Sequence, residues 1–326
     1  MFNPDPGSNG SRTSVIVGAA MAAAVVLVPA AALAATSPGP LVDVAWVKAH
    51  IGKPGIVFLD VRGKLAGKSK ANYLRGHIPG AVWTNYLKDG WRSKDKNGVA
   101  GQMSPVPKLE KLIGGLGIDN KTLVVVVPNG GKALDVGTGT RIYWTFKVLG
   151  HDNVALLNGG MVAYTKAKKP ANPLAKGAVK PVAKTFKASL RKDMLVSKAD
   201  VQKASAAGTP LIDNRPNNQY LGVNRHKLAK RYGTIPGAKN VPENWMTVNG
   251  GGTFRSKAQL AQLYKAAGVP TTGKEINFCN TGHWASIGWF VSHEIMGNKN
   301  DKMYDGSMLE WSADKGLPIE QKVKLN

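Results

Sequence analysis

Cys279 is the only cysteine of the chain, and it stands where a strand pattern changes to a helix pattern. A predicted buried strand at Glu275–Phe278 precedes it, the loop Asn280-Thr281-Gly282-His283 follows it, and a helical pattern covers 284–296. Ligands of open α/β sheets bind at the carboxyl ends of strands, and a tight loop before a helix directs several amide N–H groups at one point. Such a site favours the thiolate, which is the nucleophilic form of cysteine. The alternative is a small buried residue without chemistry, as most free cysteines are.

Two neighbours of the cysteine could take part in the same chemistry. His283 could supply a proton or a positive charge, because histidine is the usual titrating group at neutral pH. The alternative for His283 is a solvent-facing loop residue. Trp284 is predicted to form a wall of the pocket or to pack in the core.

The elements that position this loop occur twice. Four landmarks recur in the same order, about 150 residues apart, which predicts two copies of one domain. They are an apolar strand ending in Asp-x-Arg (Asp60-Val61-Arg62 and Asp213-Asn214-Arg215), an Ile-Pro-Gly segment (76–81 and 233–238), a third strand (Leu123–Val127 and 276–279) and a closing segment (157–164 and 304–311).

Each copy is predicted to be α/β, a mostly parallel sheet with helices on both faces. Leu123–Val127 is a continuous apolar run without alternation, which is typical of a strand buried on both faces. Ser197 and Ser256 are expected to be the N-caps of helices, and Ala267-Gly268 is expected to end the second helix.

The composition fits this organisation. The chain has 326 residues, 43% of them apolar, and 44 basic against 20 acidic residues give a net charge of +24. This excess favours anionic partners. A single cysteine excludes a disulfide framework and a zinc site built on several thiolates.

We divide the chain into a first domain at 35–165, which contains no cysteine, a Lys/Pro/Ala linker at 166–192 and a second domain at 193–326, which contains Cys279. The linker is too polar to fold alone, so we expect it to lie over the surface. Its lysines are not interleaved with aromatic residues, so we expect no nucleic-acid partner.

The first 34 residues read as a cleaved export signal. An uncharged apolar run at 15–28 is followed by Ala32-Leu33-Ala34, the small-x-small pattern of a signal-peptidase site. Cleavage there predicts a periplasmic protein without stable membrane insertion. The alternative is a membrane anchor at 15–35, which is long enough to cross a bilayer.

Taken together, the Asp-x-Arg strand ends, the Ile-Pro-Gly-Ala segments, the Cys-x-x-Gly-x-x-Ala loop and the Asp-Gly-Ser-x-x-x-Trp ending resemble tandem-domain rhodaneses of the exported bacterial type. These are thiosulfate and 3-mercaptopyruvate sulfurtransferases. The resemblance implies a catalytic C-terminal copy and an N-terminal copy that has lost its cysteine, and the loop at 128–139 contains none. It also implies a double displacement: Cys279 takes sulfur from a small anionic donor as a persulfide and passes it to cyanide or a thiol. No metal or organic cofactor is needed.

The resemblance, with the residues around the loop, gives the candidate site. The candidate catalytic residues are Cys279, His283 and Thr281, the last as a hydroxyl donor. The candidate substrate-binding residues are Asn280, Gly282, Trp284, Ala285, Arg215 and His77, the last at a family position that faces the cysteine. For Arg215 the alternative is an ion pair within its own strand-end motif, and Arg225 and Arg231 could present positive charge to the donor.

The departures from the family leave the substrate open between thiosulfate and 3-mercaptopyruvate. Asn280 and Thr281 replace the basic loop residues of the first type and the Gly-Ser of the second, and Gln219 stands where both types have arginine. A sulfur carrier loaded by partner proteins is the other class that stays open. A phosphatase of the related Cdc25 type is excluded, because it needs Cys-x5-Arg and position 285 is alanine.

Overall fold

The computed structural model describes residue 10, residues 37–166 and residues 171–325. The described residues from 37 onward belong to one compact unit, and the description below concerns that unit. The predicted export signal and its cleavage site at Ala34 lie outside the described residues. Within the described part of the chain, no helix is both long and apolar enough to span a membrane.

The N-terminal copy is built on a parallel sheet of five strands in the order β1-β7-β6-β2-β3. The strands are β1 (Leu41–Val42), β2 (Ile56–Asp60), β3 (Val82–Trp83), β6 (Leu123–Val127) and β7 (Val154–Leu157). Every residue of β6 is buried, as predicted for a strand covered on both faces. Val124 and Val126 pack into one core cluster, whereas Leu123, Val125 and Val127 pack into another on the opposite face.

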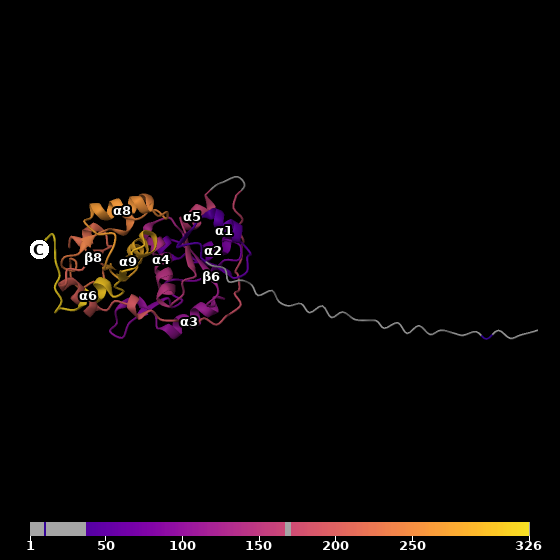
Figure 1. Cartoon of the computed structure of the whole chain (residues 1–326), viewed down its shortest axis with the longest axis horizontal. Helices are drawn as coiled ribbons and strands as arrows, with labels where there is room; N and C mark the ends of the chain where they lie inside the picture. The colour runs from indigo at the N-terminus through magenta and orange to yellow at the C-terminus, as the bar shows by residue number, and fades with distance from the viewer. Residues whose placement is uncertain (1–9, 11–36, 167–170, 326) are drawn as a thin grey trace, which may run out of the picture. The chain divides into compact units, whose positions relative to one another are not determined.

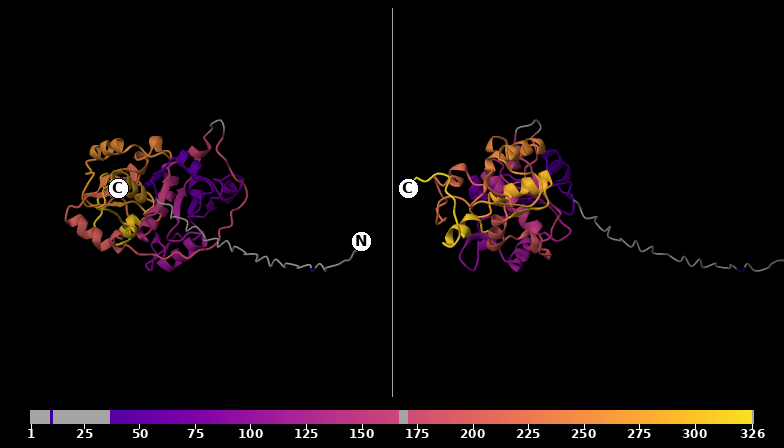
Figure 2. Two further views of the ribbon diagram at one scale, coloured as in Figure 1. Left: turned by 45° about the vertical axis from the view of Figure 1, so that its right-hand side comes forward. Right: turned by 60° about the vertical axis from the view of Figure 1, so that its left-hand side comes forward.

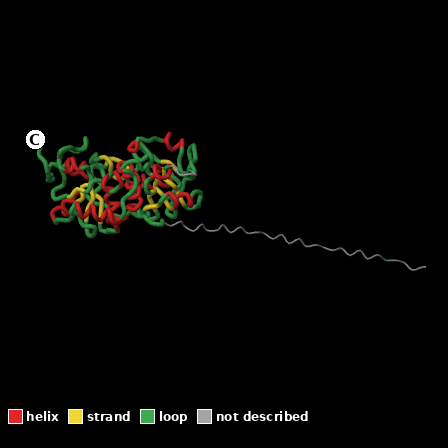
Figure 3. Tube along the Cα trace, turned by 90° about the horizontal axis from the view of Figure 1, so that it is seen from above, coloured by secondary structure: helices red, strands yellow, loops and turns green. Residues whose placement is uncertain are grey.

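The C-terminal copy repeats this order with four strands, β11-β10-β8-β9, again all parallel. The strands are β8 (Leu211–Asp213), β9 (Lys239–Asn240), β10 (Glu275–Phe278) and β11 (Asp301–Met303). Figure 3 shows the strands as two separate groups with helices around them. The predicted repeat and fold class are therefore confirmed, and only the N-terminal copy carries the additional edge strand β1.

The helices follow the strands in the alternating pattern that the sequence predicts. They are α1 (Val44–His50), α2 (Lys70–Arg75), α3 (Val106–Gly115), α4 (Ala133–Val148), α5 (Gly160–Thr165), α6 (Lys198–Ala206), α7 (Asn217–Tyr220), α8 (Lys257–Ala266), α9 (Ala285–Trp289) and α10 (Ser307–Ala313). Ser197 and Ser256 cap α6 and α8 in capping boxes, as predicted. The helix expected at 284–296 is α-helical only over α9 and continues as a π-helix at Phe290–Met296.

One element that the sequence did not predict lies outside both sheets. It is an antiparallel hairpin of β4 (Arg92–Lys94) and β5 (Ala100–Met103), inserted between β3 and α3. This hairpin carries Arg92 from the N-terminal copy to the loop of the other copy.

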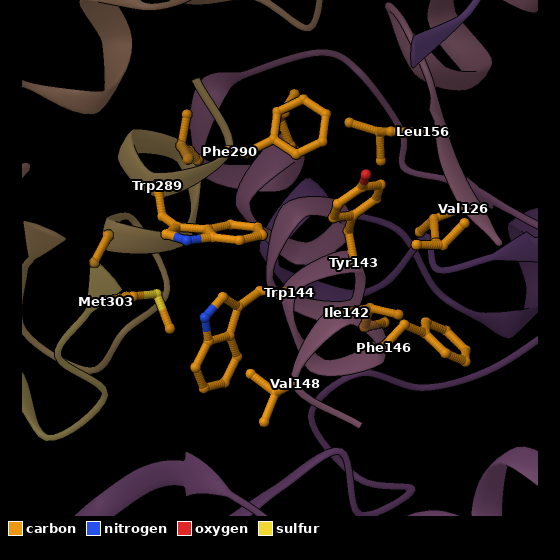
Figure 4. Close-up of a cluster of buried hydrophobic side chains, with 14 of the residues drawn as sticks. Val126, Ile142, Tyr143, Trp144, Phe146, Val148, Leu156, Trp289, Phe290 and Met303 are labelled. Atoms are coloured by element: carbon orange, nitrogen blue, oxygen red, sulfur yellow. The ribbon is translucent and has the colours of Figure 1, made fainter. Parts of the chain in front are cut away.

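The two copies share one hydrophobic core. Helix α4 packs on α9, and the two lie beside each other in Figure 1. Figure 4 shows Tyr143 and Trp144 of α4 close to Trp289 and Phe290. Tyr143 and Phe290 meet edge to face with ring centroids 4.9 Å apart, a favourable geometry for aromatic pairs. Separating the copies would expose this core to water, so we treat them as one folded body.

The segment after residue 170 runs along the N-terminal copy, as expected of a surface linker (Figure 2). It is nevertheless bound to that copy by hydrogen bonds and by a buried side chain. Lys184 N–H donates to Gly114 O at 2.9 Å, Ser189 N–H donates to Leu149 O at 2.9 Å, and Phe186 is buried against Phe146.

Candidate active site

Cys279 comes directly after β10, at the carboxyl end of a central strand. The register aligns Phe278 with Asp213 of β8, so the Asp-x-Arg motif and the cysteine leave the sheet at the same edge. The thiol side chain is 1% exposed and lines a pocket of about 170 Å³. Cys279 therefore lies where the sheet topology places a ligand site.

Ser307 of the closing motif holds the cysteine loop by its hydroxyl. Ser307 Oγ accepts hydrogen bonds from Cys279 N–H at 3.1 Å and Gly282 N–H at 3.2 Å, and it donates to Tyr304 O at 2.8 Å. Ser307 has a φ of +50°, which is rare for a residue other than glycine. The sequence marks this segment as a repeat landmark but not as the support of the loop.

Several backbone N–H groups of the cysteine loop are available to bind a ligand. Among the described residues, the N–H groups of Asn280, Thr281, His283 and Trp284 have no hydrogen-bond acceptor. Amide groups that converge in this way bind a negative charge. Because they border the pocket that contains Cys279, they are placed to stabilise a thiolate or a persulfide.

In the N-terminal copy, the equivalent loop binds a negatively charged side chain. This loop follows Val127 of β6 as the cysteine loop follows Phe278 of β10. Here the Asp135 carboxylate accepts N–H bonds from Gly130, Gly131 and Lys132 at 2.7, 3.0 and 2.9 Å. The repeat therefore uses this loop to bind an anionic group, supplied in the N-terminal copy by the chain itself.

His283 does not have the role predicted for it. The side chain is buried, Tyr86 O–H donates to its Nδ1 at 3.0 Å, and its Nε2–H donates to Leu134 O at 2.7 Å. Burial, together with the positive charge of Arg92, lowers the pKa of His283 to about 3. The predictions of a proton donor or a positive charge, and of a solvent-facing residue, are both wrong: at neutral pH the ring is neutral and both nitrogens are occupied.

Arg92 connects the hairpin of the N-terminal copy to the loop. Its Nε donates to Gly101 O at 2.8 Å, its Nη1 donates to the hydroxyl oxygen of Tyr86 at 2.8 Å, and its Nη2 donates to Thr281 O at 3.0 Å. The N-terminal copy thus holds the cysteine loop from one side through its backbone and through His283. Sequence analysis missed both Arg92 and Tyr86, because neither belongs to a repeat landmark.

A buried ion pair fixes the other side of the loop. Arg141 of α4 and Asp305 of the closing motif are 2.6 Å apart, and Met103 N–H donates to the same carboxylate at 2.7 Å. Gly282 passes beside this pair with a φ of +69°, and a Cβ atom there would collide with the Arg141 guanidinium. Glycine is therefore required at position 282 by both conformation and space.

Both copies contribute to the pocket walls. The lining residues are Leu65, Leu87, Arg92 and Leu134 from the N-terminal copy, and His226, Cys279, Asn280, Thr281, His283 and Trp284 from the C-terminal copy. Of the predicted substrate-binding residues, Asn280 and Trp284 thus lie at the pocket, and Asn280 Nδ2 donates to Gln219 Oε1 at 2.9 Å. Ala285 does not line it, because its side chain is buried in the shared core at the start of α9.

Arg215 lies outside the pocket lining, contrary to its prediction as a substrate-binding residue. Its guanidinium pairs with Asp213 at 2.5 Å and donates to Gly233 O at 2.9 Å, and the side chain is 1% exposed. Arg62 makes the same pair with Asp60 in the N-terminal copy. The alternative interpretation, an ion pair within the strand-end motif, is the one observed.

His77 is also not among the residues that line the pocket of Cys279. It is fully buried in its own copy, where it stacks on Tyr73 with ring centroids 4.2 Å apart and bonds Tyr73 O through Nδ1 at 3.0 Å. The equivalent Thr234 donates to Asp213 within the other copy. Each Ile-Pro-Gly segment therefore serves its own sheet, and the prediction that His77 faces the cysteine is wrong.

The two arginines before the second Ile-Pro-Gly segment are structural. Arg231 donates to four backbone carbonyls, those of Trp311, Ser312, Asp314 and Leu317. Arg225 donates to Ala229 O at 2.6 Å. Neither lines the pocket, and the residue of this segment that does is His226.

Comparisons with known proteins agree with this architecture. The model of the Rhodanese-like domain matches residues 43–167 and 197–314. A Haloferax volcanii protein named "Putative thiosulfate sulfurtransferase" is 30% identical over 302 residues, which cover 86% of this chain and 96% of that protein. "Sulfur carrier protein TtuD" of Thermus thermophilus is 30% identical over 295 residues, with coverage of 86% and 96%.

Solved structures show the same fold. The 3-mercaptopyruvate sulfotransferase SseA of Escherichia coli superposes with a TM-score of 0.70 at 25% identity, covering 82% of this chain and 98% of that one. EanB superposes with a TM-score of 0.72 at 22% identity, covering 87% of this chain and 70% of that one.

Proposed function

This chain belongs to the rhodanese family, with the Rhodanese-like domain present twice, and on that premise we propose that it transfers sulfane sulfur through a persulfide on Cys279. The observation that carries the proposal is the set of open amide N–H groups around the only cysteine, in a pocket that both copies enclose. The N-terminal loop supports it, because the loop at the equivalent place after β6 binds the Asp135 carboxylate through its N–H groups.

The first step forms the persulfide. The Cys279 thiolate attacks the outer sulfur of a donor such as thiosulfate, and a new S–S bond forms at Sγ. The bond between the outer and central sulfur atoms breaks, and sulfite leaves with the electron pair. The negative charge that remains on the terminal sulfur is stabilised by the loop amides.

The second step returns the enzyme to its starting state. The carbon of cyanide, or the sulfur of a thiolate, attacks the terminal sulfur of the persulfide. The S–S bond to Sγ breaks, thiocyanate or a new persulfide leaves, and the Cys279 thiolate is regenerated. The residues of the chain hold the anion and exclude bulk water, and the sequence of steps involves no other group.

A sulfur carrier is the second candidate, because a relative of 30% identity has that name. In a carrier, Cys279 would accept sulfur and hold it for a partner protein. Sustained thiocyanate release from thiosulfate and cyanide distinguishes the two, because a carrier transfers one sulfur for each chain and then stops. The enclosed pocket favours turnover on small molecules.

Intact-mass measurement tests the proposal. Incubation with thiosulfate should add the mass of one sulfur atom, and cyanide should remove it. The same incubation with 3-mercaptopyruvate tests the other donor. If neither donor adds sulfur to Cys279, the proposed mechanism is wrong.

A further inference from the structure

The polar side chains that line the pocket differ in whether they are already bonded. Apart from Trp284, whose buried indole N–H has no partner among the described residues, they are Arg92, His226, Asn280, Thr281 and His283. Both nitrogens of His283 are occupied, and the Arg92 guanidinium is held in place by three bonds to protein oxygens, which use three of its five N–H groups. One N–H of the Asn280 amide donates to Gln219, and the amide oxygen is an acceptor, which repels an anion.

Two of these side chains have a polar donor group without any partner. Among the described residues, neither the Thr281 hydroxyl nor His226 Nε2 has a hydrogen-bond partner. Leu228 N–H donates to His226 Nδ1 at 3.2 Å, so Nδ1 is the acceptor and the ring proton is on Nε2. His226 therefore presents an N–H donor that no other protein group uses.

The segment around His226 is built to hold this ring. The corresponding connection in the N-terminal copy is shorter, because Arg62 reaches Gly76 O across 14 residues whereas Arg215 reaches Gly233 O across 18. The additional residues are ordered by the Arg225 bond to Ala229 O at 2.6 Å and by Asn224 N–H donating to Asn218 O at 3.0 Å. This longer connection brings a half-buried imidazole to the pocket that contains Cys279.

We propose that His226 is a substrate-binding residue, whose Nε2–H donates a hydrogen bond to an oxygen of the oxyanion that leaves when Cys279 takes the sulfane sulfur. The inference rests on the proposed function and names its substrate class: a sulfane donor whose leaving group carries oxyanion oxygens, as sulfite does. His226 then supplies the contact that the missing basic loop residues would otherwise make.

The character of the site supports this assignment. Burial, with the neighbouring charge of Lys227, lowers the pKa of His226, so at neutral pH the ring contributes a directed hydrogen bond rather than a charge. Leu65, Leu87 and Leu134 form the apolar part of the wall and bond no oxygen. A hydrogen bond to a charged acceptor changes binding by about ten- to a hundredfold.

The test separates loading from unloading of Cys279. Persulfide formation is followed by intact mass at increasing thiosulfate concentration, and removal of sulfur by cyanide is followed on protein that is already loaded. In His226→Ala, the thiosulfate concentration for half-maximal loading rate should rise by about ten- to a hundredfold. Removal by cyanide should be unchanged, because cyanide has no oxyanion.

Two further variants make the result specific. His226→Gln keeps an N–H donor of similar reach, so it should restore part of the thiosulfate affinity. Asn224→Ala changes an exposed side chain of the same segment and should load like the wild type. An unchanged thiosulfate dependence in His226→Ala, or an equal loss in both steps, overturns the inference. Wild-type protein that never gains sulfur would instead overturn the proposed function.

Discussion

Replacing Tyr86 with phenylalanine removes a single oxygen atom from the junction between the two copies. That oxygen accepts from Arg92 Nη1 at 2.8 Å and donates to His283 Nδ1 at 3.0 Å. The phenylalanine ring fills the same space, so the core is not opened. The variant therefore tests the hydrogen bonds alone.

The expected loss in the free energy of unfolding follows from the groups that lose a hydrogen bond in this variant. His283 Nδ1 is buried and loses its only donor, which costs about 1–3 kcal/mol. Arg92 is half-buried and keeps its bonds to Gly101 O and Thr281 O, so its loss is smaller. We expect the free energy of unfolding to fall by about 2 kcal/mol. Because both groups hold the cysteine loop, kcat/KM for sulfur transfer should fall by about tenfold.

Tyr143→Phe is the matched control. Tyr143 O–H also bonds across the copies, to Glu294 Oε2 at 2.9 Å, but it lies outside the pocket lining. Urea unfolding and the thiosulfate:cyanide assay on both variants separate stability from activity. Tyr143→Phe should lose stability with activity near wild type. Equal activity in the two variants would refute the reasoning that the hydroxyl of Tyr86 positions the loop.

Three other predictions concern the nucleophile, a buried carboxyl group and export. Cys279→Ser should abolish thiocyanate release while the melting temperature stays near that of wild type, because a hydroxyl is not ionised at neutral pH; retained activity would refute the persulfide mechanism. Burial raises the pKa of Glu275 to about 7 from its ordinary value of 4.5, so the protonated folded form is favoured. The stability that this group contributes should be full at pH 4.5 and below and should be lost as the pH rises through 7, so over this range urea unfolding of Glu275→Gln should show a weaker decrease in stability than that of the wild type; an identical pH dependence would contradict this linkage. We also propose that the chain is exported and cleaved near Ala34; recovery of the full-length chain in the membrane fraction would favour the anchor instead.

Local sequence patterns were sufficient for the fold and for the position of the nucleophile. The repeat of four landmarks predicted two sheets of the same order, and the unbroken apolar run of β6 predicted burial on both faces. Ser197 and Ser256 were found as N-caps, because a cap depends on residues only three positions apart. Cys279 was placed at a strand end for the same reason, since the strand and the helix are both read from adjacent residues.

Which hydrogen bonds the side chains of the site make depends on the tertiary structure. The pKa and the proton of His283 depend on Tyr86, which is 197 residues away in sequence, and on Leu134, which is 149 residues away. No local pattern shows that these groups meet, so the sequence predicts a titrating residue at His283 and gives no signal for the unbonded N–H donor of His226. A side chain's residue type determines which bonds it can form, but only packing between distant segments decides which of those bonds are already made.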